Sequence, residues 1–157
     1  MNRPLRIAAI HDLSGFGRCS LTVILPVLSA MGMQVCPVPT AVLSTHTGGM
    51  GEVVMRDLTD FLEPALDHYR RLELAFECIY TGFLGSPEQI SHCLDYFRSY
   101  PQALAVVDPV MGDHGKSYRT VTVVDIRYLA SDLLERFVTF HGSEDVLFLY
   151  STMVLHN

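Results

Sequence analysis

Short continuous apolar runs alternate along this chain with stretches in which apolar residues recur every three or four positions. Continuous runs bounded by turn-forming residues are typical of strands buried on both faces. They occupy residues 5–10, 33–38, 76–80, 103–107 and 146–150. The periodic stretches predict helices over residues 21–31, 58–72, 86–97 and 126–137. Strands alternating with helices form right-handed βαβ units, so the pattern predicts an α/β fold with a parallel sheet covered by helices on both faces.

Several helix ends carry local signals. Ser86, Pro87 and Gln89 provide an N-cap, a first-turn proline and a capping-box partner. Gly32 follows the first periodic stretch as a C-terminal cap. Pro26 lies inside that stretch, which predicts a kink or a late helix start.

Composition narrows the class of protein. The 157 residues are 49% apolar and 18% charged, which indicates one globular domain and excludes disorder as the bulk state. The net charge of −6 argues against nucleic-acid and anionic-membrane partners. No apolar run approaches the ~20 residues that span a bilayer, and the first ten residues lack a signal-peptide core, so we expect a cytosolic (cytoplasmic) protein. Without a CxxC pair, the four cysteines are expected to be buried free thiols, and a structural metal is not expected.

Small, polar and acidic residues gather at the ends of four successive predicted strands. They occupy residues 11–17, 44–49, 81–86 and 108–115. Each segment alone resembles an ordinary connecting loop. Because ligands bind beyond the carboxyl ends of the strands in an open α/β sheet, the four together predict a binding site.

The first of these segments offers backbone and side-chain groups to a small polar ligand. Gly15 and Gly17 precede a helix, where backbone N–H groups could approach a phosphate or a polar ring. A dinucleotide fingerprint is a poor fit because Ser20 stands where its third glycine belongs, and no P-loop motif occurs. The hydroxyls of Ser14 and Thr47 suit a polar ring, or merely the capping of a turn.

The last segment carries two carboxylates across a Pro/Gly turn. Asp108 and Asp113 suit a Mg²⁺–phosphate assembly, and the alternative is an Asx-turn pair that only shapes the loop. Lys116 and Arg119 could meet phosphate, although solvated charge is the commoner role. Histidines on these loops could donate hydrogen bonds to a heteroaromatic ring or a phosphate; they are His11, His46 and His114. No nucleophile–base pair is recognisable.

Four motifs carry a resemblance to a known family. They are HDLSGFGRCSLTVILPVLSAMG (11–32), LSTHTGG (43–49), IYTGFLGSPEQI (79–90) and VVDPVMGDHGK (106–116). In this order and at about this spacing they resemble pyridoxal/pyridoxine (vitamin B6) kinases of the ribokinase-like superfamily. The resemblance covers residues ~5–120 and implies a three-layer ribokinase-like fold, incomplete at its C-terminal side.

The resemblance implies roles for particular residues of the substrate site. The loop after the first strand binds the B6 ring in such kinases, which points to Asp12 or Ser14. The His-Thr-Gly loop closes over the ring, which points to His46 and Thr47. Phe83 stands where the family often has tyrosine, so the pocket keeps an aromatic ring and loses a hydroxyl.

The resemblance also implies the co-substrate and the reaction. Asp108 and Asp113 match the acidic pair near Mg²⁺ and the ATP phosphates, and Tyr118 matches a residue near the nucleotide. The reaction would transfer the γ-phosphoryl group of ATP to the 5′-hydroxymethyl group of a B6 vitamer. Members of the family commonly dimerise, so a homodimer is implied as well.

The sequence departs from the family in its second half. Such kinases are nearly twice as long and carry a G-x-G-D motif whose aspartate is the general base; no G-x-G-D occurs here, nor the expected T-P-N element. We therefore expect residues 1–120 to be the front part of a kinase domain, with a divergent tail over 121–157. A missing base costs about 10²–10⁴-fold in rate, so weak or absent kinase activity is expected. The alternatives are a non-catalytic module that binds a B6 vitamer or a protein partner, and a hydroxymethylpyrimidine kinase.

Overall fold

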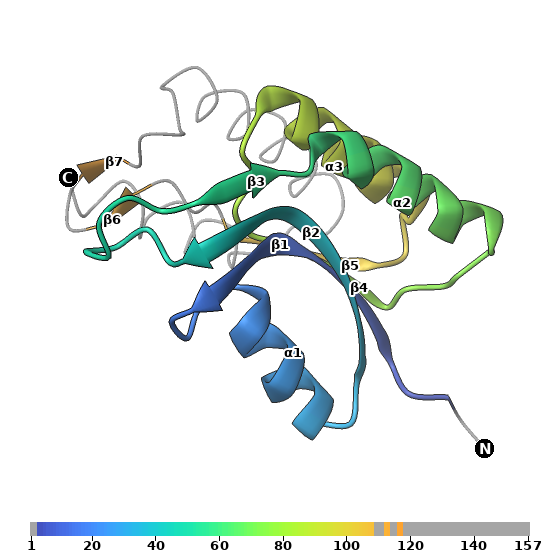
Figure 1. The fold of residues 1–157 in the computed structure, drawn as a ribbon. Helices are drawn as coiled ribbons and strands as arrows, with labels where there is room; N and C mark the ends of the chain where they lie inside the picture. Colours follow the sequence, from blue (N-terminus) through green and yellow to red (C-terminus); the bar gives the residue numbers. More distant parts are fainter. Residues whose placement is uncertain (1–2, 109–111, 114–115, 118–157) are drawn as a thin grey trace. The chain divides into compact units, whose positions relative to one another are not determined.

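The computed structural model describes residues 3–108, 112–113 and 116–117, and it divides the chain into two units, residues 1–110 and 111–157. The predicted alternation of strands and helices is confirmed as far as Val107, apart from an unpredicted short strand over Met55–Asp57 (Figure 1). The predicted helix over 126–137 and strand over 146–150 lie outside the described residues. The elements in chain order are β1 (Arg6–Phe16), α1 (Leu21–Ala30), β2 (Gln34–Thr45), β3 (Met55–Asp57), α2 (Thr59–Arg71), β4 (Cys78–Thr81), α3 (Pro87–Ser99), β5 (Leu104–Val107), β6 (Gly112–Asp113) and β7 (Lys116–Ser117).

The first unit is built on a five-stranded sheet in the order β3-β2-β1-β4-β5. The pairs β1–β2, β1–β4 and β4–β5 are parallel, and only the short β3 runs antiparallel to its neighbour β2. Helix α1 packs on one face of the sheet, while α2 and α3 lie on the other (Figure 1). The predicted three-layer α/β architecture is therefore confirmed for this unit.

The core lies between the sheet and its helices. Fully buried apolar side chains occupy the middle of the three central strands, among them Ile10, Val38 and Ile79. On the helix side Leu62 and Leu66 of α2 are equally buried. Each such side chain contributes about 1.5–3 kcal/mol by leaving water. This packing holds the strand ends, and with them the polar residues that follow, in fixed positions.

Strands β1 and β2 are longer than the apolar runs predicted. The expected ends were Ile10 and Val38, whereas the strands continue to Phe16 and Thr45. The extra length contains an irregularity, because the pairing shifts by one residue between His11 and Leu13. Such bulges kink a strand and redirect side chains. Here the irregularity lies at Asp12, one of the predicted substrate-binding residues.

The helix ends follow the local signals in part. Helix α1 begins at Leu21 and includes Pro26, so a late start is wrong. At α3 the predicted N-cap is confirmed, since the Ser86 hydroxyl accepts a hydrogen bond from the Gln89 backbone N–H. The capping-box part is wrong, because the Gln89 side chain bonds the backbone N–H of Gly85 instead.

All four cysteines are free, as predicted, although only Cys93 is fully buried and the other three are half-buried. In the described part of the chain no helix is long and apolar enough to cross a membrane.

Candidate functional site

The carboxyl ends of β1, β2, β4 and β5 meet at one edge of the sheet because these strands are parallel neighbours. This edge carries most of the predicted site. Asp12 and Ser14 lie in the extended end of β1, His46 and Thr47 directly follow β2, Phe83 follows β4, and Asp108 directly follows β5. Asp113 belongs to β6 in the second unit, where only its backbone is described, and Tyr118 lies outside the described residues.

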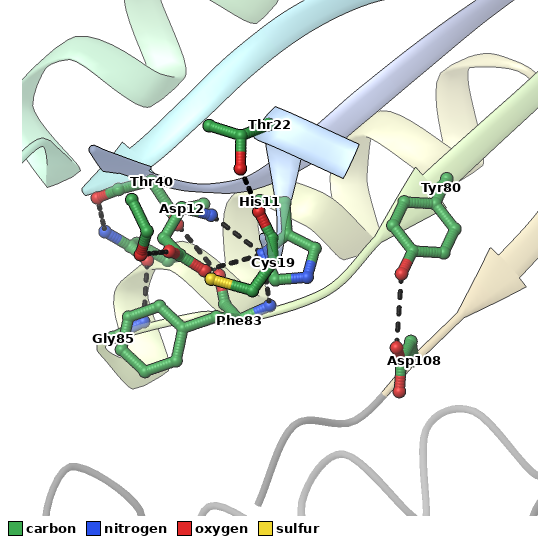
Figure 2. A network of polar contacts seen from close by, with 11 residues as sticks. His11, Asp12, Cys19, Thr22, Thr40, Tyr80, Phe83, Gly85 and Asp108 are labelled. Carbon is green, nitrogen blue, oxygen red and sulfur yellow. Dashed lines mark hydrogen bonds and ion pairs between the residues drawn. The ribbon is translucent and has the colours of Figure 1, made fainter. Parts of the chain in front are cut away.

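Asp12 is the centre of a buried hydrogen-bond network (Figure 2). One carboxylate oxygen accepts from the Ser14 hydroxyl at 2.8 Å, and the other lies 2.8 Å from Nδ1 of His11. Burial alone would raise the pKa of Asp12, but hydrogen bonds from His11, Ser20 and Ser14 outweigh it and lower the pKa. Asp12 is therefore a carboxylate at neutral pH, oriented by its neighbours.

His11 connects Asp12 to the loop that follows β4. In the tautomer that carries its proton on Nδ1, His11 donates to the Asp12 carboxylate at 2.8 Å. In the other tautomer the same nitrogen accepts from the backbone N–H groups of Asp12 and Phe83, at 2.9 and 3.3 Å, and it cannot do both at once. The ring packs directly on Gly82, where a Cβ atom would lie only 1.9 Å from its Cδ2. Glycine at position 82 is thus required for the histidine to occupy this place.

Phe83 contacts its neighbours through its backbone, and its ring is packed against protein rather than facing an open pocket. Its N–H faces His11, and its carbonyl accepts the Thr40 hydroxyl at 2.8 Å. The aromatic ring is 9% exposed and packs in a small apolar cluster with Ala41, Leu43 and Val53. The structure therefore gives Phe83 a firm position at the strand edge while most of its ring contacts protein.

Gln89 supports the site through long-range hydrogen bonds that the sequence did not predict. It is fully buried, and its amide nitrogen donates to the Thr40 carbonyl at 3.0 Å and to the Thr59 hydroxyl at 2.8 Å. Its amide oxygen accepts from the Gly85 backbone at 2.8 Å. One side chain thus joins β2, the start of α2 and the loop after β4. A buried amide with both ends satisfied stiffens its surroundings.

His46 connects the segments that follow β1 and β2. Its backbone N–H donates to the Phe16 carbonyl at 3.1 Å, and its Nδ1 accepts from the Gly48 N–H at 3.1 Å. Gly17 has a positive φ of 104°, and a Cβ there would lie 2.3 Å from the histidine ring. His46 is half-buried and Thr47 is exposed.

At the other end of the edge, Asp108 is exposed and has one side-chain partner among the residues that the structure describes. The Tyr80 hydroxyl donates to its Oδ2 at 3.1 Å (Figure 2). Its backbone N–H continues the strand pairing by donating to the Thr81 carbonyl at 2.8 Å. Within the described ranges no group of three histidine, cysteine, aspartate or glutamate side chains forms a metal site.

The chain is similar to several known proteins over most of its length. No family model matches it. A curated Schizosaccharomyces pombe protein, provisionally named a pyridoxal kinase, is 28% identical over 134 residues, which are 80% of this chain and 42% of the relative. A Bacteroides thetaiotaomicron crystal structure, provisionally named a phosphomethylpyrimidine kinase, is 46% identical with a TM-score of 0.76, covering 83% of this chain and 47% of that one. Another crystal form of that protein contains pyridoxal. Pyridoxal kinase from Lactobacillus plantarum is 36% identical with a TM-score of 0.72, covering 82% and 47%.

These neighbours confirm the resemblance carried by the four motifs. They are named as pyridoxal kinases and phosphomethylpyrimidine kinases, which point to a ribokinase-like fold, and the described sheet matches part of that fold. The chain spans about half the length of the relatives it matches.

Proposed function

We propose that this chain provides the substrate-binding half of a B6 vitamer kinase, which transfers the γ-phosphoryl group of ATP to the 5′-hydroxymethyl group of pyridoxal, pyridoxine or pyridoxamine. The observation that carries the proposal is the buried cluster at the strand edge. There the Asp12 carboxylate accepts from the Ser14 hydroxyl and lies 2.8 Å from Nδ1 of His11, beside Phe83, whose carbonyl accepts the Thr40 hydroxyl. The 46% identical structure that contains pyridoxal supports a B6 ring as the ligand of this edge.

The proposed substrate contacts are Asp12, Ser14, His46, Thr47 and Phe83. An ionised, buried Asp12 can accept a hydrogen bond from a ring hydroxyl or a protonated pyridine nitrogen, both of which a B6 vitamer offers. His46 and Thr47 border the same edge from β2. Because this carboxylate is already oriented, little ordering is needed when the ring binds.

The proposed nucleotide contacts are Asp108, Asp113 and Tyr118. The carboxylate of Asp108 is exposed at the strand edge and has the hard oxygen donors that Mg²⁺ takes, so it fits a Mg²⁺–ATP complex. The metal would neutralise charge on the phosphate oxygens during transfer. Residues 1–120 form this kinase part in our proposal, and 121–157 a divergent tail.

We expect slow or absent phosphoryl transfer by these 157 residues alone, because they contain no G-x-G-D base. Binding of the vitamer is therefore the decisive test. Pyridoxine titrated by calorimetry is the suitable probe, since it lacks the aldehyde that would form an imine with Lys116 or the N-terminal amine. Asp12→Asn should weaken binding about tenfold or more, by loss of a charged acceptor. Asp60→Asn, at an exposed position in the first turn of α2, is the matched control and should bind as the wild type does.

A second substrate is favoured by one specific observation, the 46% identity to a protein named as a phosphomethylpyrimidine kinase. Hydroxymethylpyrimidine is also a small ring with a hydroxymethyl arm. Titrating pyridoxine and hydroxymethylpyrimidine into the same preparation distinguishes the two proposed substrates. Tighter binding of pyridoxine supports the B6 assignment, tighter binding of the pyrimidine reverses it, and binding of neither contradicts both.

A further inference from the structure

Tyr80 lies between the two ends of the strand edge and contacts both. It is the third residue of β4, paired with Ala9 of β1 and Val106 of β5. Its ring stacks on the His11 ring, with centroids 6.0 Å apart and an interplanar angle of 24°. Its hydroxyl reaches across to Asp108 on the neighbouring strand end (Figure 2). No motif of the sequence analysis assigned this residue a role.

The phenol ring of Tyr80 is anchored. His11, on which it stacks, is itself held by Asp12 and packs against Gly82. The Tyr80 hydroxyl donates to the Asp108 carboxylate at 3.1 Å, and a phenol ordinarily keeps this proton at neutral pH. Tyr80 therefore has a fixed ring and a hydroxyl that can donate a hydrogen bond to a neighbouring group.

The Asp108 side chain, in contrast, has few contacts with the described residues. Its side chain is exposed, and among the described residues the carboxylate receives one hydrogen bond, from Tyr80 to Oδ2. The backbone is fixed by the pairing with Thr81. Within the described part of the chain, Oδ2 thus has a partner and Oδ1 has none, so Oδ1 can bind a further group.

We propose that Tyr80 is a positioning residue, whose hydroxyl orients the Asp108 carboxylate so that its second oxygen meets a divalent metal ion bound to nucleotide phosphates. This inference rests on the proposed kinase function. Hydrogen bonds that orient ligating carboxylates commonly change metal affinity by about 10–100-fold. Because Asp108 is exposed, the effect here lies at or below the lower end of that range.

The test compares Tyr80→Phe with Tyr69→Phe in the full chain. Both substitutions delete one phenol hydroxyl and keep the ring, and Tyr69 lies on α2, where it packs against Phe76. The probe is Mn²⁺ with ATP, followed by water-proton relaxation, and pyridoxine is titrated separately. Tyr80→Phe should weaken Mn²⁺–ATP binding about three- to tenfold, while pyridoxine affinity and the melting temperature stay unchanged. Tyr69→Phe should leave both affinities unchanged.

A double-mutant cycle separates orientation from a merely structural role. Asp108→Ala removes the acceptor of this contact and should weaken Mn²⁺–ATP binding at least as strongly. Adding Tyr80→Phe to Asp108→Ala should then have little further effect, because the two residues act as a unit. The proposal is overturned by unchanged Mn²⁺–ATP affinity in Tyr80→Phe, by additive effects in the cycle, or by a wild-type chain that does not bind Mn²⁺–ATP. Failure to bind pyridoxine would instead contradict the proposed function.

Discussion

The two ends of the strand edge hold their polar groups in opposite ways. The buried cluster, made of His11, Asp12, Ser14, Thr40 and Gln89 around the Phe83 backbone, satisfies its polar groups internally. The Tyr80–Asp108 pair has one hydrogen bond and an exposed carboxylate. Buried polar groups are tolerated only when paired, whereas an exposed carboxylate can always bind water. The cluster is therefore rigid, and the pair can exchange partners at low cost.

This contrast makes a general prediction about substitutions. Changes in the buried cluster should lower stability and ligand affinity together, because the same contacts support both. Changes in the Tyr80–Asp108 pair should alter ligand affinity while leaving stability nearly unchanged.

The largest effect is expected for Gln89→Leu. The substitution removes a fully buried amide and leaves the half-buried Gly85 N–H without its partner, and a donor left unsatisfied away from water costs about 1–3 kcal/mol. With the lost bonds to Thr40 and Thr59, we expect the free energy of unfolding to fall by about 2–4 kcal/mol. Urea denaturation measures it, with the exposed Gln102→Leu as control. A loss no larger than that of the control would mean that the cluster is not rigid.

Gly82→Ala should come next. The added methyl group would overlap the His11 ring, which must then leave Asp12 and the stack with Tyr80. Overpacking of this kind costs about 1–3 kcal/mol. Thermal unfolding should show the loss, and pyridoxine binding should weaken in the same variant.

Gly85→Ala is the matched control for Gly82→Ala, from the same loop. A Cβ there approaches only the ends of side chains, at 3.3 Å or more, so a smaller loss is expected. Equal losses of thermal stability in the two variants would show that any added methyl group in this loop is destabilising, whether or not it displaces the His11 ring.

The sequence was sufficient to predict which strand ends carry polar residues and that they meet, because parallel neighbouring strands bring their carboxyl ends to one edge. It was insufficient for the lengths of β1 and β2. Polar residues from His11 onward interrupt the apolar run of β1, and Pro37 and Pro39 suggest that β2 ends. Since β3 pairs with β2 only from Ala41, these prolines occupy a sheet edge, where proline is tolerated.

The contacts that hold the site were beyond sequence reasoning for a related reason. Local spacing offered Gln89 one role, as a capping-box partner, whereas its side chain bonds residues 30 and 49 positions away. The contact between Tyr80 and Asp108 likewise spans 28 residues and depends on the register of β4 and β5. Periodicity predicts elements but gives neither their order in a sheet nor their register. The roles assigned to Asp113 and Tyr118 stay predictions.

A smaller effect is expected from Asp12→Asn, and it depends on pH. The folded-state pKa of Asp12 lies below its ordinary value of about 3.9, so its contribution to stability is complete above that pH and is lost as pH falls through the folded pKa. Urea unfolding between pH 3 and 6 should show a shallower loss toward acid in Asp12→Asn than in the wild type. The exposed Asp60→Asn should keep the wild-type slope, and an identical slope in Asp12→Asn would exclude an ionised, stabilised Asp12.

The smallest expected effect comes from a direct comparison of the two ends of the edge, in which one hydroxyl group is deleted at each end. Thr40→Val removes the 2.8 Å bond to the Phe83 carbonyl at a fully buried position, and should cost about 1–2 kcal/mol in urea unfolding. Tyr80→Phe removes the 3.1 Å bond to exposed Asp108, which water can replace, and should cost less than about 0.5 kcal/mol. Equal costs would mean that burial does not separate the two ends of the edge. The expected inequality would show that the hydroxyl of Tyr80 contributes to orientation rather than to stability.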